Sequence, residues 1–242
     1  MDKAQTFASI EQHTLSCNNC ALPELCLRAG LPPDDVERLD HLVYTRRKVR
    51  RREDLYRAGD PFSALYAIRS GFFKSERVQK DGRSQIMGFY MSGEILGMDG
   101  IGAEAYPCHA VALQDAEVCA IPLSRIEELP HDLLAHQLAH RLRQLMSKEI
   151  VREQGVMLLL GGRSGETRVA AFLVNISRRF AERGYPNSVL ELPMTREDIG
   201  SFLGLKLETV SRFFSKMQEK KLIEVRQRHI RILDAVSLEQ ML

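Results

Sequence analysis

Long apolar segments and secretion signals are missing from this sequence. No apolar run approaches the roughly 20 residues that a membrane span requires, and no secretory signal opens the chain. Cysteine is scarce, and its count of five is odd. A chain of 242 residues can bury a core without disulfide cross-links, so disulfides are the least expected use of the thiols. We therefore expect a protein of the reducing cytoplasm with no membrane partner.

Catalytic patterns are also missing. No Ser/His/Asp order, phosphate-cradling glycine loop or carboxylate pair stands out, and the seven histidines are scattered like ordinary surface or core residues. The sequence therefore favours a protein that is not an enzyme. Its composition, with 44% hydrophobic and 27% charged residues, is that of a globular protein of one or two domains.

Charge is nearly balanced, at a net +2, but it is unevenly distributed. From Arg163 to the end, 14 Lys or Arg stand against 10 Asp or Glu, so this region carries +4 and the remainder −2. A modestly basic C-terminal third is compatible with nucleic-acid binding, and a solvated basic face would have the same composition.

Three cysteines lie within ten residues of one another. Cys17, Cys20 and Cys26 are spaced C-x₂-C-x₅-C, and Cys108 and Cys119 lie far along the chain. An iron–sulfur cluster needs a soft sulfur ligand at each iron and usually takes four cysteines, so three local ligands require a distant fourth. Structural zinc usually uses two short cysteine pairs, and the second pair is missing here. A metal-free thiol redox switch, or no metal site, stays open at this point.

The order of apolar runs and turns predicts an α+β protein. Short apolar runs separated by turn signals such as Gly59-Asp60-Pro61 and Ser92-Gly93-Glu94 predict a β-roll or sandwich. The predicted parts are a cysteine-rich segment at 1–28, a jelly-roll-like sensor domain at 29–128, a long dimerisation helix at 129–161 and a winged helix-turn-helix domain at 162–242.

The long helix carries a stripe at the alternating spacing of three and four that suits a two-helix seam. The stripe consists of Leu142, Met146, Ile150, Glu153, Met157 and Leu160. Glu153 interrupts it, and a carboxylate facing its symmetry mate in a desolvated interface would weaken the dimer. Two other readings stay open: the helix packs on its own roll, or Glu153 turns to the rim of the seam.

The C-terminal region has the pattern of two short helices joined by a glycine turn. Thr195 and Asp198 form a capping box that opens a helix through Leu203, and Gly204 ends it. The next helix, at about 206–221, is predicted to bury four apolar residues: Val210, Phe213, Phe214 and Met217. Alternating residues at 222–225 and 229–232 predict a β-hairpin wing, so the whole matches a winged helix-turn-helix. Helix packing without DNA is the alternative.

The opposite face of that second helix has side chains that suit base edges. Arg212 can donate two bonds to guanine, Glu208 can accept from a cytosine amino group, and Ser211 can bond to either. Phosphate contacts, which position a protein without reading sequence, fall to Lys206, Lys216, Arg226 and Arg228, and Thr195 completes the predicted DNA-binding set. A solvated charged face would have the same pattern.

These residues together resemble the cyclic-AMP receptor / fumarate-nitrate-reduction regulator superfamily, in its oxygen-sensing iron–sulfur branch. The resemblance covers nearly the whole chain, and Glu208-Thr209-Val210-Ser211-Arg212 is its most specific part. It is also carried by the cysteine loop, Leu65-Tyr66-Ala67-Ile68-Arg69-Ser70-Gly71, Gly93-Glu94-Ile95-Leu96-Gly97 and Leu145-Met146-Ser147-Lys148-Glu149-Ile150. It implies an oxygen-responsive regulator of anaerobic genes that binds a palindromic DNA site as a homodimer and contacts RNA polymerase through roll loops such as 73–83.

The resemblance further implies a [4Fe–4S] cluster whose fourth ligand is Cys119, the cysteine before Ala120-Ile121-Pro122. Strand alternation agrees, because it places Cys119 on the face opposite Val118, away from the roll interior. Cys108 is the alternative fourth ligand. The Arg-Ser or Arg-Thr pair with which the cyclic-nucleotide branch holds its phosphate has no counterpart at 102–109, so we expect no cyclic-nucleotide effector.

Overall fold

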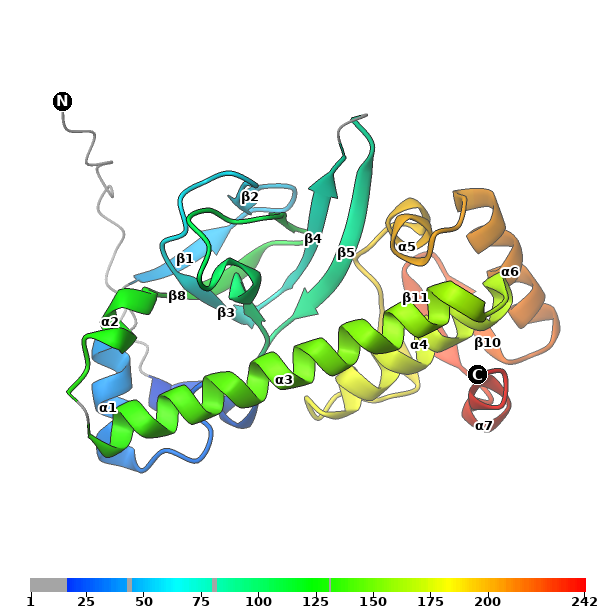
Figure 1. Ribbon diagram of the computed structural model, residues 1–242. Helices are drawn as coiled ribbons and strands as arrows, with labels where there is room; N and C mark the ends of the chain where they lie inside the picture. Colours follow the sequence, from blue (N-terminus) through cyan, green and yellow to red (C-terminus); the bar gives the residue numbers. More distant parts are fainter. Residues whose placement is uncertain (1–16, 43–44, 80–81, 131) are drawn as a thin grey trace.

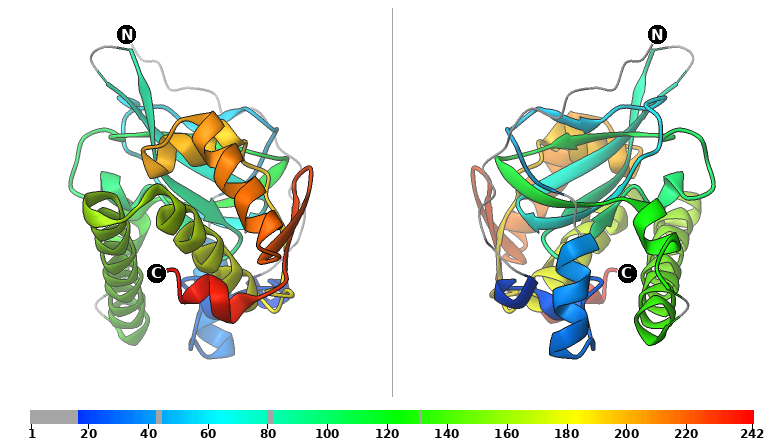
Figure 2. Two further views of the ribbon diagram at one scale, coloured as in Figure 1. Left: turned by 90° about the vertical axis from the view of Figure 1, so that its right-hand side faces the viewer. Right: turned by 90° about the vertical axis from the view of Figure 1, so that its left-hand side faces the viewer.

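The computed structural model describes residues 17–242 apart from 43–44, 80–81 and 131. Most of the predicted 1–28 segment, up to residue 16, lies outside these residues. Within the described part, no helix is long and apolar enough to cross a membrane. Figures 1 and 2 show a roll at one end, a small helical domain at the other, and one long helix running along the side of both.

The roll consists of two four-stranded antiparallel sheets. One has the order β1-β8-β3-β6 and the other β2-β7-β4-β5. Their strands are β1 (Thr45–Val49), β2 (Asp54–Tyr56), β3 (Leu65–Ser70), β4 (Phe72–Val78), β5 (Ser84–Met91), β6 (Ile95–Leu96), β7 (His109–Ala112) and β8 (Ala116–Ile121). Alternating burial along β8, from buried Val118 to half-buried Cys119, is the period of two that gives each strand an inner and an outer face.

Helices flank the roll at the N-terminal side. The segment before them has two short 3₁₀ turns, η1 (Cys17–Asn19) and η2 (Pro23–Leu25), and η3 (Met98–Gly100) lies inside the roll sequence. Helix α1 (Pro33–Leu42) precedes β1, and α2 (Leu123–Glu127) follows β8. The prediction assigned residues 29–128 to the roll domain and did not foresee α1, which buries Val36, Leu39 and Leu42 at the spacing of a helix.

Helix α3 (Leu133–Gly162) confirms the predicted long helix. Asp132 caps its first turn by accepting a hydrogen bond from the amide of Ala135 at 3.1 Å. Figure 1 shows that α3 begins beside α1 and α2 and runs to the C-terminal domain, where it contacts α4, so it connects the two ends of the molecule.

The C-terminal domain begins with α4 and has the predicted winged helix-turn-helix fold. Its elements are α4 (Gly165–Ala181), β9 (Val189–Glu191), α5 (Arg196–Leu203), α6 (Leu207–Glu219), β10 (Ile223–Arg226), β11 (His229–Ile232) and α7 (Ala235–Glu239). The capping box at Thr195 is formed in both directions, and Gly204 ends α5 in the left-handed region at φ 63°. The predicted wing pairs β10 with β11, and β9 adds a third strand.

The C-terminal domain packs tightly on the β4–β5 face of the roll. Ile86, Phe89 and Met91 belong to the same buried cluster as the core of α4, α5 and α6. The ring of Phe89 lies 5.9 Å from that of Phe172 and 5.3 Å from that of Phe202. Lys74 adds an ion pair with Asp198 of α5 at 3.0 Å.

Candidate functional site

Four of the five cysteines line one small cavity at the outer face of the β1-β8-β3-β6 sheet. Cys17, Cys20 and Cys26 come from the N-terminal segment and Cys119 comes from β8, as the alternation along that strand predicts. The cavity has a volume of about 30 Å³. Its lining is otherwise mostly apolar and includes three arginines; among these residues are Leu22, Leu27, Leu39, Ile121, Arg28, Arg46 and Arg69.

Polar contacts from two helices hold the cysteine segment in place. The carboxylate of Asp40 on α1 accepts from the amide of Cys17 at 2.7 and 2.9 Å. Arg141 on α3 donates from Nε to the carbonyl of Cys26 at 3.1 Å and from Nη2 to that of Glu24 at 2.7 Å. The segment is therefore bonded both to the helix that precedes the roll and to the long helix.

Burial raises the pKa of three of these thiols and so favours their protonated form. It raises the pKa of Cys26 to about 11, and it raises the pKa of Cys17 further, with the help of the Asp40 carboxylate. Burial also raises the pKa of Cys119, while the nearby guanidinium groups of Arg46 and Arg69 act in the opposite direction. A ligand that needs thiolates must therefore supply positive charge of its own.

The donor set fits an iron–sulfur cluster in its chemistry. All five cysteines are free, and four of them face one largely apolar space whose lining includes three arginines. The cavity is small, with room for about one water molecule. In the described part of the chain, no three potential ligands converge closely enough to hold a metal ion.

Cys108 lies elsewhere. It is 8% exposed, just before β7, and is not among the residues that line the cysteine cavity. Burial and the neighbouring carboxylate of Asp99 raise its pKa to about 11. The structure thus places Cys108 apart from the other four thiols.

Tyrosine side chains fill the space between the two sheets of the roll. The rings of Tyr56 and Tyr106 stack with centroids 3.9 Å apart, and Tyr66 stacks on Tyr56 at 5.7 Å. The hydroxyl of Tyr106 donates to the carbonyl of Ala64 at 2.7 Å, so it is held by the backbone. This interior is a packed aromatic core.

Helix α6 has one buried and one exposed face, as predicted. Val210, Phe214 and Met217 are buried, whereas the predicted buried Phe213 is only half-buried. On the other face Glu208 and Arg212 are exposed and Ser211 is half-buried. The three predicted base-reading side chains therefore lie together on the accessible side of this helix.

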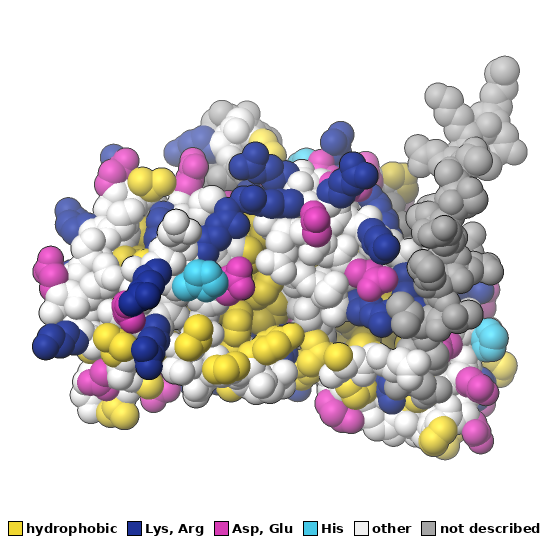
Figure 3. Space-filling view, turned by 180° about the vertical axis from the view of Figure 1, so that it is seen from behind, with side chains coloured by type: hydrophobic (Ala, Val, Ile, Leu, Met, Phe, Trp, Pro, Cys, Tyr) yellow, Lys and Arg dark blue, Asp and Glu magenta, His cyan; other side chains and the backbone are white. Residues whose placement is uncertain are grey.

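The predicted phosphate contacts fall around the same helix. Thr195 and Lys206 are exposed at the starts of α5 and α6. Lys216 forms an ion pair with Glu166 of α4, which also binds Lys220 at 2.9 Å. Basic side chains are exposed on the wing as well, namely Arg226, Arg228 and Arg231. Figure 3 shows Lys and Arg side chains on this end of the molecule, seen from behind.

The stripe on α3 divides into two parts. Leu142 packs against the cluster that contains Leu27 of the cysteine segment, and Met146 is half-buried. Further along, Ile150 is 52% and Met157 70% exposed, and Glu153 is exposed between them, while Leu160 is half-buried. The first half of the helix thus packs on its own subunit, and the second half presents apolar side chains to solvent.

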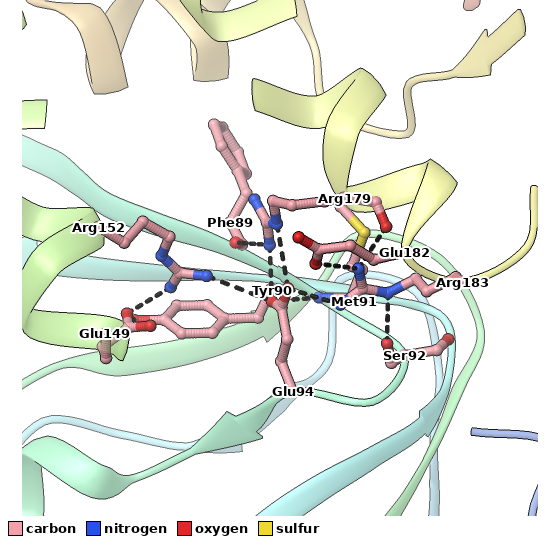
Figure 4. A network of polar contacts seen from close by, with 10 residues as sticks. All are labelled: Phe89, Tyr90, Met91, Ser92, Glu94, Glu149, Arg152, Arg179, Glu182 and Arg183. Atoms are coloured by element: carbon pink, nitrogen blue, oxygen red, sulfur yellow. Dashed lines mark hydrogen bonds and ion pairs between the residues drawn. The ribbon is translucent and has the colours of Figure 1, made fainter. Parts of the chain in front are cut away.

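A buried charge network that the sequence reading missed joins the roll to the helices (Figure 4). Glu94, on the turn before β6, pairs with Arg179 at 2.6 Å, with Arg183 at 2.7 Å and with Arg152 of α3 at 3.5 Å. Burial alone would raise the pKa of Glu94, but the three guanidinium charges outweigh it and hold the pKa at about 2. Arg179 lies on α4 and Arg183 just past its end, so no periodicity within one element signalled this pairing.

Two known protein families match most of the chain. The cyclic nucleotide-binding domain matches residues 46–132 and the Crp-like helix-turn-helix domain matches residues 167–241. Among solved structures, FixK2 from Bradyrhizobium japonicum superposes with a TM-score of 0.74 at 29% identity, covering 81% of this chain and 96% of that one.

Relatives align over nearly the full length. The chain is 40% identical to the transcriptional activator protein FnrA of Stutzerimonas stutzeri, over 94% of this chain and 92% of the relative. It is 41% identical to the transcriptional activator protein anr of Pseudomonas aeruginosa, over 92% and 90%. It is 36% identical to the fumarate and nitrate reduction regulatory protein of Escherichia coli K12, over 94% and 90%.

Proposed function

Because this chain belongs to the Crp/Fnr superfamily of DNA-binding transcription regulators, in the branch of the fumarate and nitrate reduction regulators, we propose that it senses oxygen through an iron–sulfur cluster. It is not an enzyme. One observation carries the proposal: four cysteines that are separated by up to about a hundred residues in sequence line a single cavity.

The ligands we propose are Cys17, Cys20, Cys26 and Cys119, around a [4Fe–4S] cluster. Four thiols with few competing oxygen or nitrogen donors suit iron in this form. When bound, the cluster supplies oxidant-sensitive iron–sulfur bonds and the positive charge that turns buried thiols into thiolates. Arg46 and Arg69 beside Cys119 support the thiolate form there.

The active form we propose is a homodimer in the cytoplasm. The solvent-exposed half of the α3 stripe, which includes Ile150 and Met157, forms the dimer interface, and Glu153 keeps the dimer only marginally stable. Two copies of α6 then enter successive major grooves of a palindromic site whose half-sites lie about 34 Å apart. A cluster held by these four cysteines would make the dimer, and with it the affinity for DNA, sensitive to oxidants.

We propose that no cyclic nucleotide regulates this protein. The stacked rings of Tyr56, Tyr66 and Tyr106 occupy the roll interior, and the segment 102–109 has no Arg-Ser or Arg-Thr pair for a phosphate. For RNA polymerase we propose a contact at the β4–β5 hairpin, where Arg77 and Arg83 are exposed. The tip residues Lys80 and Asp81 lie outside the described part of the chain.

Anaerobic purification tests the proposal. Visible absorbance and iron per chain are measured first, then DNA binding before and after exposure of the same sample to air. A brown protein with about four irons per chain that loses colour and DNA affinity together supports the sensor. A colourless protein that cannot be reconstituted contradicts it, and if its DNA binding follows dithiol reagents, the metal-free redox switch takes its place.

A further inference from the structure

One short turn of the roll, Ser92–Glu94, is joined to the C-terminal domain by hydrogen bonds and ion pairs. The guanidinium of Arg179 donates to Glu94 from Nε at 3.0 Å and from Nη2 at 2.6 Å, and its Nη2 also donates to the carbonyl of Phe89 at 2.7 Å. Arg183, two residues past the end of α4, donates to Glu94 at 2.7 Å and to the carbonyl of Ser92 at 2.6 Å. Arg179 belongs to α4, the first helix of the C-terminal domain, Arg183 lies in the turn just after its end, and Figure 4 shows both converging on this turn.

The same turn touches the cysteine segment on its other side. Gly93 lines the cysteine cavity, and a Cβ at this position would lie 2.8 Å from Cβ of Leu25, the neighbour of Cys26. Gly93 has φ +88°, in the region that favours glycine, and its amide donates to the carbonyl of Ile68 at 2.7 Å. A movement of Leu25 toward the sheet would therefore press on the backbone next to Glu94.

The long helix joins the same network. Arg152 of α3 pairs with both Glu94 and Glu149, and its guanidinium lies 4.9 Å from the ring centroid of Tyr90. The hydroxyl of Tyr90 donates to Glu149 at 3.1 Å. A single carboxylate on the roll is thus the shared partner of α3 and α4.

We propose that the Ser92–Glu94 turn transmits the state of the cysteine site to the DNA-binding domain within one subunit, with Glu94 as the positioning residue for α4. The inference rests on the proposed function and adds a route that does not pass through the dimer seam. Ionic pairing suits this role, because a buried carboxylate with three fixed partners accepts only a few arrangements, and a shift of the turn must move α4 with it.

The test compares DNA affinity with and without the cluster in matched variants. The probe is a duplex with a two-fold symmetric site selected with the wild-type protein. The dissociation constant of the protein–DNA complex is measured twice, once with anaerobic, cluster-loaded protein and once with protein freed of cluster by air and a chelator. We call the ratio of these two dissociation constants the coupling ratio. Glu94→Gln and Arg183→Met break the link, and Glu104→Gln and Arg178→Met are controls at exposed positions on the roll and on α4.

We expect the coupling ratio of both network variants to fall about fivefold or more below that of the wild type, with the controls unchanged. Iron per chain and visible absorbance stay at wild-type values, since no proposed ligand is touched. Sedimentation at the assay concentration shows whether dimerisation is also unchanged, as the inference requires. Thermal unfolding confirms that the variants are folded; if Glu94→Gln is not, Arg183→Met carries the test, because Glu94 keeps Arg179 and Arg152.

A lower melting temperature with an unchanged coupling ratio would show a merely structural network and overturn the inference. So would a fall in the ratio that sedimentation traces wholly to weaker dimerisation. A failure of the proposed function appears in the wild type itself, as missing iron or as equal DNA affinity in the two states, and is thereby told apart from a failure at Glu94.

Discussion

Nη2 of Arg183 lies 2.7 Å from Oε1 of Glu94, a pair that spans 89 positions of sequence and joins the roll to the DNA-binding domain. The side chain of Arg183 is only 3% exposed and that of Glu94 19% exposed. Neither charge has much access to water, so each depends on the other, and the pair should be visible in the stability of the protein.

Lowering the pH should reduce the free energy of unfolding, because it protonates Glu94. Its pKa is held at about 2, below the ordinary value of 4.5, so the stabilisation is fully present above pH 4.5 and is lost as the pH falls toward 2. A depression of this size contributes on the order of 3 kcal/mol to the free energy of unfolding. Urea unfolding at pH 6, 4 and 3 measures it. In Glu94→Gln the decline over this range should be shallower than in Glu104→Gln; equal slopes would refute the assignment.

Replacement of single cysteines should separate the fourth ligand from the bystander. We expect Cys119→Ser to lose most of its iron on anaerobic purification, because Cys119 faces the other three thiols, and Cys108→Ser to keep it, because Cys108 lies apart beside Asp99. Iron analysis and visible absorbance decide between them. Iron loss from Cys108→Ser with retention in Cys119→Ser would reverse the assignment.

Removal of the carboxylate from the seam should strengthen the dimer. Burial raises the pKa of Glu153, as do the charges of Glu149 and Asp99, which shows a poor environment for a carboxylate even before a partner subunit approaches. Glu153→Ala should lower the dimer dissociation constant in air about fivefold, or about 1 kcal/mol. Sedimentation velocity checks this against Gln154→Ala, the exposed neighbour. Unchanged dimerisation of Glu153→Ala would place residue 153 at the rim.

Arg212 and Lys206 should make different kinds of contact with DNA. Arg212 is exposed on α6, so Arg212→Ala should cost about 1–3 kcal/mol at one base pair of each half-site and relax the preference there. Lys206 lies at the N-cap of α6, so Lys206→Ala should weaken binding evenly across sequences and reduce the salt slope by about one. Binding to a set of single-base variants at two salt concentrations separates them. A uniform loss for Arg212→Ala would mark a phosphate contact.

Two glycine-to-alanine changes should have opposite effects on stability. A Cβ at Gly200 of α5 would lie 2.5 Å from the carbonyl oxygen of Leu205, in the turn before α6, so Gly200→Ala must force the two helices apart. We expect it to lower the free energy of unfolding by about 1–3 kcal/mol. Gly155 of α3 has open space around it, and Gly155→Ala should stabilise by up to about 1 kcal/mol. Thermal unfolding of both variants tests the pair, and a neutral Gly200→Ala would contradict the close approach.

Local patterns in the sequence were sufficient for the C-terminal domain. The capping box at Thr195, the glycine at 204 and the apolar face of α6 each act over one or two helical turns, where periodicity and capping chemistry are decisive. Strand alternation likewise placed Cys119 on the outer face of the roll. The half-buried state of Phe213 departs from the prediction because it lies at the edge of the apolar stripe.

Relationships between distant segments were not predictable in this way. Helix α1 was missed because its three buried residues are few among charged ones. The pairing of Glu94 with Arg179 and Arg183 depends on how the C-terminal domain docks on the roll, and no spacing within one segment records that docking. The family resemblance supplied the fourth cysteine, but it did not indicate that the turn at Gly93 touches Leu25.

The length of α3 gives small movements at the cysteine segment a large reach. Its 30 residues form a rod about 45 Å long, bonded near its start to the carbonyls of Cys26 and Glu24 through Arg141 and near its end to Arg168 of α4 through the carbonyl of Leu160. A tilt of about 5° at the first end displaces the other by about 4 Å. That exceeds one base-pair step of the double helix, so a slight tilt of α3 would be large on the scale at which α6 has to fit DNA.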